Sequence, residues 1–161
     1  YLGLIPYYLA DRPWTLITAM FIHAGFGHIL FNMIALFFFG RTLKAFVGDN
    51  MFLLVYFVGG IVGNLLFLGL NLNGLSIVVG ASGAVYAIAG ALVVMHPKMP
   101  ILFWGIIPMP LWVFVVVFLG ILSLPFVSAA GIAWQAHLGG LATGLIAGYF
   151  FRRRLRRSLF F

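Results

Sequence analysis

The sequence feature that most limits the fold of this chain is a series of five apolar stretches, which have charged residues only near their ends. They alternate with short loops and cover residues 27–45, 51–70, 82–96, 110–124 and 133–151. The hydrocarbon core of a bilayer is about 30 Å thick, so a membrane-spanning helix needs about 20 predominantly apolar residues. The pattern predicts an all-α fold, a polytopic membrane helical bundle with five visible spans.

Composition favours a single membrane domain over residues 1–161. The chain has 65% hydrophobic and 7% charged residues, whereas soluble domains have about 45–50% apolar and 25% charged residues. Five spans of about 20 residues, with their loops, leave no length for a separate soluble domain. Residues 1–25 are interrupted by prolines and rich in aromatics, so we expect an interfacial loop there. Residues 152–161 are expected to form a basic cytoplasmic tail.

The lysines and arginines predict the orientation of the bundle. Arg41, Lys44, Lys98 and the tail arginines fall on one side of the membrane, whereas Arg12 falls on the other. Cytoplasmic loops carry the excess of Lys and Arg, so we expect a multi-pass protein of a prokaryotic cell membrane with a cytoplasmic C-terminus. Five tail arginines supply most of the net charge of +7, which is typical of an anchor to membrane lipids rather than of nucleic-acid binding.

The scarcity of acidic residues excludes several kinds of catalytic site. Asp11 and Asp49 are the only carboxylates, and the chain has no cysteine. Facing aspartates, a metalloprotease H-E-x-x-H site and a thiol nucleophile are therefore excluded. A metal site built from His23, His28 and His137 would lack a carboxylate or thiolate ligand. We expect neither a metal nor a cofactor.

Three polar residues from three different spans share one depth. His28, Ser82 and His137 lie 16, 16 and 15 residues before the basic residues that end their spans. At ~1.5 Å per helical residue, each lies roughly 22–24 Å above that end, which is near the outer face of the membrane. Asn32 lies one turn after His28 and therefore on the same helix face.

A serine and a histidine at one depth can perform nucleophilic catalysis, because the imidazole takes the hydroxyl proton and returns it to the leaving group. With no carboxylate at this depth, Ser82 and His137 would act as a dyad. Tyr86, one turn after Ser82, is placed to pack its ring against His137. Close approach of the two helices is favoured by their small residues, which are Gly83, Ala87, Gly90, Gly140, Gly144 and Gly148.

Other polar groups would complete such a site. His28, Asn32 and the backbone N–H of Ser82 would donate hydrogen bonds to an oxyanion. The same residues could instead have structural roles. Ser82 could be a small residue at a helix contact, and His28 or Asn32 could form hydrogen bonds between helices. His23, in the loop before the first span, is expected to be a structural hydrogen-bonding residue.

Three motifs together resemble the rhomboid intramembrane serine proteases. Residues 23–32 are similar to the family's H-x4-H-x3-N segment, residues 80–86 to its G-x-S-G-x-x-Y motif, and residues 136–144 to its A-H-x-x-G-x-x-x-G motif. The resemblance implies a six-helix core whose first span is absent from this sequence. The residue roles that it implies are nucleophile for Ser82, general base for His137, oxyanion donors for His28 and Asn32, and support for Tyr86, His23, Gly80, Gly83, Gly140 and Gly144.

Two positions depart from the family pattern. Trp14-Thr15 stands where the family has Trp-Arg, and Lys44 stands where a glutamate is usual. Both are structural positions in the family, so the departures concern loop anchoring and helix contacts rather than chemistry.

These observations predict an intramembrane serine endopeptidase that cleaves transmembrane or juxtamembrane segments of membrane proteins through a Ser–His dyad and an acyl-enzyme. The expected partners are transmembrane protein substrates and membrane lipids. The main alternative is a catalytically silent relative that binds membrane-protein clients. A small channel or transporter would require an internal repeat or a line of polar residues through the bundle, and the sequence has neither.

Overall fold

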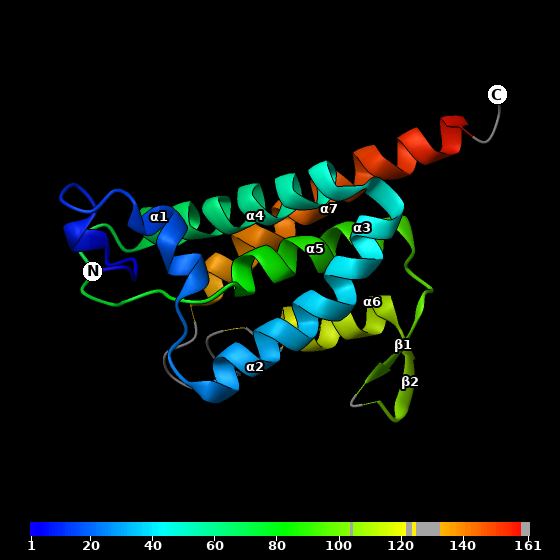
Figure 1. Cartoon of the computed structure of the whole chain (residues 1–161), viewed down its shortest axis with the longest axis horizontal. Helices are drawn as coiled ribbons and strands as arrows, with labels where there is room; N and C mark the ends of the chain where they lie inside the picture. Colours follow the sequence, from blue (N-terminus) through cyan, green and yellow to red (C-terminus); the bar gives the residue numbers. More distant parts are fainter. Residues whose placement is uncertain (104, 122–123, 125–132, 159–161) are drawn as a thin grey trace.

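The computed structural model describes residues 1–103, 105–121, 124 and 133–158. The chain is largely helical, as the sequence predicts, and its longest helices lie side by side (Figure 1). The α-helices are α1 (Thr15–Thr18), α2 (Phe26–Ala35), α3 (Arg41–Val47), α4 (Asp49–Leu70), α5 (Ser82–Met95), α6 (Leu111–Phe114) and α7 (Trp134–Ser158). Short 3₁₀ turns occupy Pro6–Tyr8 and Ala19–Phe21, and π-helical turns occupy Leu36–Gly40 and Val115–Gly120.

Helix α5 is the centre of the bundle. Helices α4 and α7 pack against one side of it, and α2, α3 and the π turn after α6 pack against the other (Figure 1). Residues 83–92 of α5 are all buried. A helix that is apolar on every side is favourable only where neighbours or lipid surround it, and here neighbouring helices surround α5.

Within the described residues, two helical stretches have the length and apolar composition to cross a membrane. They are Phe26–Val47, which joins α2, a π turn and α3, and Asp49–Leu70. Helix α5 and the stretch Leu111–Gly120 are shorter than the predicted spans. Helix α5 does not need 20 residues, because the surrounding helices shield its ends from lipid. Only backbone N–H and C=O groups that face lipid must form their hydrogen bonds within their own helix.

The ends of the predicted spans differ from the helices observed. The predicted fourth span, residues 110–124, is helical from Leu111 to Gly120, and residues 122 and 123 lie outside the described part of the chain. The predicted fifth span and the first part of the predicted tail form one helix, α7, which continues to Ser158. Good helix formers such as arginine explain this continuation.

A β-hairpin connects α5 to α6, which the all-α prediction does not include. Strand β1 (Pro100–Phe103) pairs antiparallel with β2 (Ile107–Pro110). Gly105 in the connecting turn has a φ of +70°, a conformation that favours glycine. The apolar residues 101–107 are too few to cross a bilayer, and residues 100–103 pair with residues 107–110 instead.

Many large apolar side chains are exposed on the outside of the bundle. Such a surface would be unusual for a soluble monomer and is typical of a lipid-facing one. Its residues include Phe31, Phe37 and Phe38 on the first long helix, Leu53, Leu54 and Leu65 on α4, and Ile146 and Phe150 on α7.

The first 25 residues form an irregular layer at one end of the bundle, as shown in Figure 1. Leu4 pairs with Val78 through two backbone hydrogen bonds of 3.0 and 2.8 Å. The Asn64 side chain of α4 donates a 2.8 Å hydrogen bond to the carbonyl of Leu16. These contacts attach the layer both to α4 and to the segment that leads into α5.

At the opposite end, Lys44 and Asp49 form an ion pair across the turn between α3 and α4. The Lys44 Nζ and Asp49 Oδ2 atoms are 3.1 Å apart, and both side chains are more than half exposed. Gly48 between them has a φ of +80°, so the turn itself depends on glycine.

We expect Lys44→Glu to lower the melting temperature by only about 2–4 °C, because an exposed ion pair contributes at most about 1 kcal/mol. Thermal unfolding in detergent measures this change. Lys44→Gln is the control that removes the attraction without adding repulsion from Asp49. A loss of folded protein in Lys44→Glu alone would show that this turn tolerates no second negative charge.

Candidate active site

Ser82 and His137 meet at the end of the bundle that carries the irregular layer. Ser82 is the first residue of α5, and His137 lies in the first turn of α7. The Nε2 atom of His137 lies 2.7 Å from the Oγ atom of Ser82. This distance is within hydrogen-bonding range for proton transfer between a nucleophile and its base.

The Tyr86 ring orients the imidazole of His137. The two rings are stacked, with centroids 4.2 Å apart and planes inclined by 17°. The Nδ1 atom of His137 is buried and has no hydrogen-bond partner among the described residues. Ring stacking therefore fixes the orientation of this imidazole, whereas in a catalytic triad a hydrogen-bonded carboxylate does so.

Glycines let α5 and α7 approach at backbone distance. A Cβ atom added to Gly140 would overlap the carbonyl oxygen of Gly83, and one added to Gly144 would overlap that of Ala87. One turn further along, a Cβ at Gly148 would lie 2.9 Å from the Cα of Ala91. This close contact of small residues is typical of membrane helices, and it holds His137 against Ser82.

The loop before Ser82 has a backbone shape that only glycine adopts readily. Gly80 has a φ of +119°, and its N–H donates a 2.9 Å hydrogen bond to the carbonyl of Ala19. A Cβ at Gly80 would lie 2.7 Å from Cε1 and Nε2 of His28 and 3.8 Å from Oγ of Ser82. Gly80 therefore makes room for the His28 ring beside the serine.

A hydrogen bond from the backbone selects the tautomer of His28. The N–H of Ala24 donates to Nδ1 of His28 over 3.3 Å. Because Nδ1 is the acceptor, a neutral His28 carries its proton on Nε2. Nε2 and Cε1 are the His28 ring atoms nearest to the Cβ position of Gly80, so a hydrogen-bond donor lies beside the loop that carries Ser82.

Asn32 is buried on the same helix, one turn after His28. Its Nδ2 atom donates a 2.8 Å hydrogen bond to the carbonyl of His28. An amide nitrogen has two N–H groups, so one of them is still available to a second acceptor. His23 packs its ring edge-on against that of His28, with centroids 5.1 Å apart. Both ring nitrogens of His23 are buried without a hydrogen-bond partner in the described part of the chain.

The start of α5 contributes a further donor. The first N–H groups of a helix have no carbonyl partner within it, and Ser82 is the first residue of α5. The positive end of the helix dipole also lies there. A negatively charged oxygen formed beside Ser82 would therefore meet both a free N–H and a favourable dipole.

An apolar cavity of about 430 Å³ lies beside the stacked rings of Tyr86 and His137. Tyr86 and His137 form part of its wall. The remaining walls come from α5, the π turn after α6 and α7, and include Val93, Val116, Leu119, Leu141 and Leu145.

Some contacts that shape the site are not readable from side-chain types. The carbonyl of Ala19 and the N–H of Ala24 fix Gly80 and His28, yet any residue could supply these backbone groups. Sequence proximity is a signal only for the second contact, since Ala24 lies four residues before His28, whereas Ala19 is distant from Gly80 along the chain. The cavity was missed as well, because its walls come from helices distant in sequence.

Comparisons with known proteins assign the family. The model of the rhomboid domain matches residues 10–154. RHOMBOID-like protein 1 of Arabidopsis thaliana is 32% identical, with 91% of this chain and 36% of that protein covered. The putative rhomboid protease YdcA of Bacillus subtilis is 42% identical, with 48% and 38% covered. The rhomboid protease GluP of the same organism is 29% identical, with 83% and 25% covered.

The chain spans 25–38% of the length of these three relatives. The matched domain nevertheless includes every residue of the site described above. The chain therefore belongs to the rhomboid family and is a membrane protein.

Proposed function

We propose that this chain is an intramembrane serine endopeptidase that cleaves transmembrane or juxtamembrane segments of other membrane proteins. The observation that carries the proposal is the 2.7 Å contact between Nε2 of His137 and Oγ of Ser82. The stacked Tyr86 ring supports it further, because a general base needs a fixed orientation toward its nucleophile.

In the proposed reaction, Ser82 Oγ attacks the carbonyl carbon of the scissile peptide bond while His137 takes the hydroxyl proton. The oxygen of the tetrahedral intermediate accepts hydrogen bonds from the Ser82 N–H, from Nε2 of His28 and from the second N–H of Asn32. His137 then protonates the leaving amine, which leaves an acyl-enzyme on Ser82. Water hydrolyses this ester with His137 acting again as the base.

A fluorophosphonate probe tests the proposal directly, because it phosphonylates a serine that is activated by a base. We expect mass spectrometry of the labelled protein to identify the peptide that contains Ser82. Labelling of another serine, or no labelling of folded protein, would favour the catalytically silent alternative, a rhomboid-like protein that binds membrane-protein clients.

The oxyanion role of His28 predicts a loss of rate rather than of binding. We expect His28→Ala to lower kcat for a reconstituted transmembrane substrate about a hundredfold with little change in KM, as is usual when an oxyanion donor is lost. The measurement is steady-state cleavage of one substrate in one detergent. His28→Phe is the matched control, because it keeps a ring against Gly80 but has no N–H. Near-normal kcat in His28→Phe would assign His28 a packing role only.

We also propose that the protein lies in the cell membrane of a prokaryote with its catalytic end outward and α7 ending in the cytoplasm. The positions of Lys44, Lys98 and the α7 arginines support this orientation. The chain has no cysteine, so single cysteines can report the side directly. We expect Gly25→Cys to react with a membrane-impermeant thiol reagent in intact cells, and Lys98→Cys to react only after permeabilisation.

A further inference from the structure

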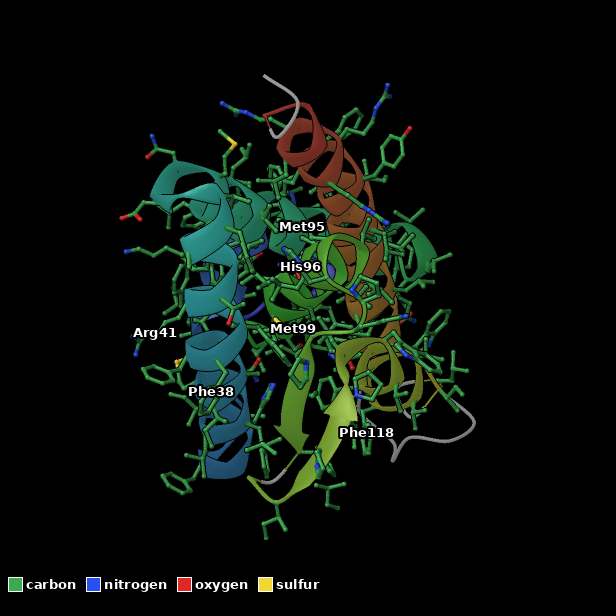
Figure 2. The ribbon with its side chains drawn as sticks, turned by 90° about the vertical axis from the view of Figure 1, so that its right-hand side faces the viewer. Phe38, Arg41, Met95, His96, Met99 and Phe118 are labelled. Atoms are coloured by element: carbon green, nitrogen blue, oxygen red, sulfur yellow. The ribbon has the colours of Figure 1, made fainter. Side chains whose placement is uncertain are left out.

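A second cavity lies at the end of the bundle opposite to Ser82. It has a volume of about 430 Å³, and its walls are Phe46, Met95, His96, Pro97, Lys98 and Met99. Figure 2 looks onto this end of the molecule and shows Met95, His96 and Met99 between α3 and α7. The proposed catalytic residues do not reach this cavity, so their chemistry does not explain it.

The walls of this cavity are held in place by the turn that follows α5. The backbone N–H of Leu111 donates a 2.8 Å hydrogen bond to the carbonyl of Met99, and that of Trp112 donates a 3.1 Å bond to Pro97. On the other side, the His96 ring stacks on the Phe46 ring with centroids 4.2 Å apart. The turn is thus attached to α3 and to α6, which favours a cavity that exists before any ligand binds.

The cavity combines apolar walls with two polar groups. Phe46, Met95 and Met99 supply the apolar part. Lys98 is exposed and has no ion-pair partner within the described residues. The Nε2 atom of His96 is buried and likewise has no hydrogen-bond partner there. Since buried polar groups are normally paired, this nitrogen is suited to form a hydrogen bond with a polar ligand group.

The charges around the cavity are nearly all positive. Asp49 is the one carboxylate of the sequence at this end, and it is already paired with Lys44. Arg152 of α7 donates a 3.3 Å hydrogen bond to the carbonyl of Val94, just before the cavity. A ligand with a negative headgroup and an apolar body would match both the charge and the walls.

We propose that this cavity binds one anionic phospholipid of the cytoplasmic leaflet, with its phosphate near Lys98 and His96 and the start of an acyl chain against Phe46, Met95 and Met99. The cytoplasmic leaflet is rich in anionic lipids, which attract lysine and arginine at its surface. The proposal rests on the proposed orientation of the bundle and not on the proposed reaction.

Native mass spectrometry of the full chain in an uncharged detergent tests the site with phosphatidylglycerol as the probe. We expect one tightly bound phosphatidylglycerol, and weaker binding of phosphatidylcholine with the same acyl chains. Lys98→Gln is expected to weaken phosphatidylglycerol binding about fivefold, as for the loss of one lysine near a lipid headgroup. His96→Phe, which keeps the stack on Phe46 but removes both ring nitrogens, is expected to weaken it as well.

Arg41→Gln is the matched control. Arg41 is exposed near the same end of the bundle, but it lies over the ring of Phe37 at 5.1 Å and does not line the cavity. In Figure 2 its label lies on the outer side of the helix, away from His96 and Met99. We expect Arg41→Gln to bind phosphatidylglycerol within twofold of the unsubstituted chain.

Three results would overturn the proposal. Equal weakening by Lys98→Gln and Arg41→Gln would mean diffuse attraction to the whole basic end. Displacement of the lipid by millimolar inorganic phosphate would mean that the site takes a free anion. Unchanged binding in both Lys98→Gln and His96→Phe would place the lipid elsewhere. The melting temperature of each variant verifies the fold without reference to Ser82, so a failure of this site is distinguishable from a failure of the proposed catalysis.

Discussion

Ser82→Ala and His137→Ala are each expected to abolish cleavage of a transmembrane substrate, with a loss of at least ~10⁴-fold in kcat, because the two residues act as one unit. The hydrogen bond of 2.7 Å between them is the physical reason. Without Oγ no acyl-enzyme forms, and without the imidazole the hydroxyl keeps its proton. Both variants should remain folded, because the close contact between α5 and α7 depends on Gly83 and Gly140 rather than on these side chains.

The measurement is cleavage of a reconstituted substrate by purified protein, with the melting temperature of each variant as the check on folding. Ser76→Ala is the matched control, since Ser76 is exposed in the loop before α5. The double variant Ser82→Ala/His137→Ala should be no slower than either single variant. Substantial turnover by folded Ser82→Ala would contradict the dyad.

Gly140→Val is expected to remove activity as completely as the loss of a catalytic residue. Even a Cβ atom at Gly140 would overlap the carbonyl oxygen of Gly83 and lie 2.8 Å from its carbonyl carbon. These are backbone atoms, so they cannot rotate away and the two helices must separate. A displacement of about 1 Å at a catalytic group already costs about a hundredfold in rate, and valine requires more.

Two further glycine substitutions serve as controls. They distinguish the loss of activity caused by separating α5 from α7 at Gly140 from any general effect of placing a valine in a helix. Gly69→Val on α4 should leave activity nearly unchanged, because nothing lies within 4 Å of its added Cβ. Gly148→Val lies on the same face of α7 as Gly140 and also meets backbone atoms, those of Ala91. It should lower stability, yet the folded fraction should label at Ser82 faster than Gly140→Val does. Normal labelling of Gly140→Val would show that α7 can move without carrying His137 away.

The depth of the site could be predicted because helices rise regularly. Counting back from Lys44, Lys98 and the α7 arginines puts His28, Ser82 and His137 at one level, and the structure has Ser82 and His137 in contact. The ring of Tyr86 lies where the spacing from Ser82 predicts it. These inferences depend only on spacing within single helices and on the sign of the flanking charges.

Other parts of the structure depend on backbone groups, which any residue type could supply. The β1–β2 hairpin forms because its two strands pair with each other. The sequence alone showed only that this apolar segment is too short to cross a membrane. The tautomer of His28 depends on the N–H of Ala24, and the shape of the loop at Gly80 depends on the carbonyl of Ala19. Every residue has such a backbone N–H and C=O group except proline, which lacks the N–H, so composition and periodicity do not predict these contacts.

The separation of Ser82 and His137 along the chain has a consequence for biosynthesis. Ser82 and His137 are 55 residues apart, and the helix that carries His137 is α7, which is made after the helix α5 that begins with Ser82. While the ribosome is still synthesising α7, the nascent chain holds a serine with no base and an α5 without one of its covering helices. With the proposed dyad, proteolytic competence would begin only once α7 has entered the membrane, which would prevent a half-made chain from cutting its neighbours at the translocon.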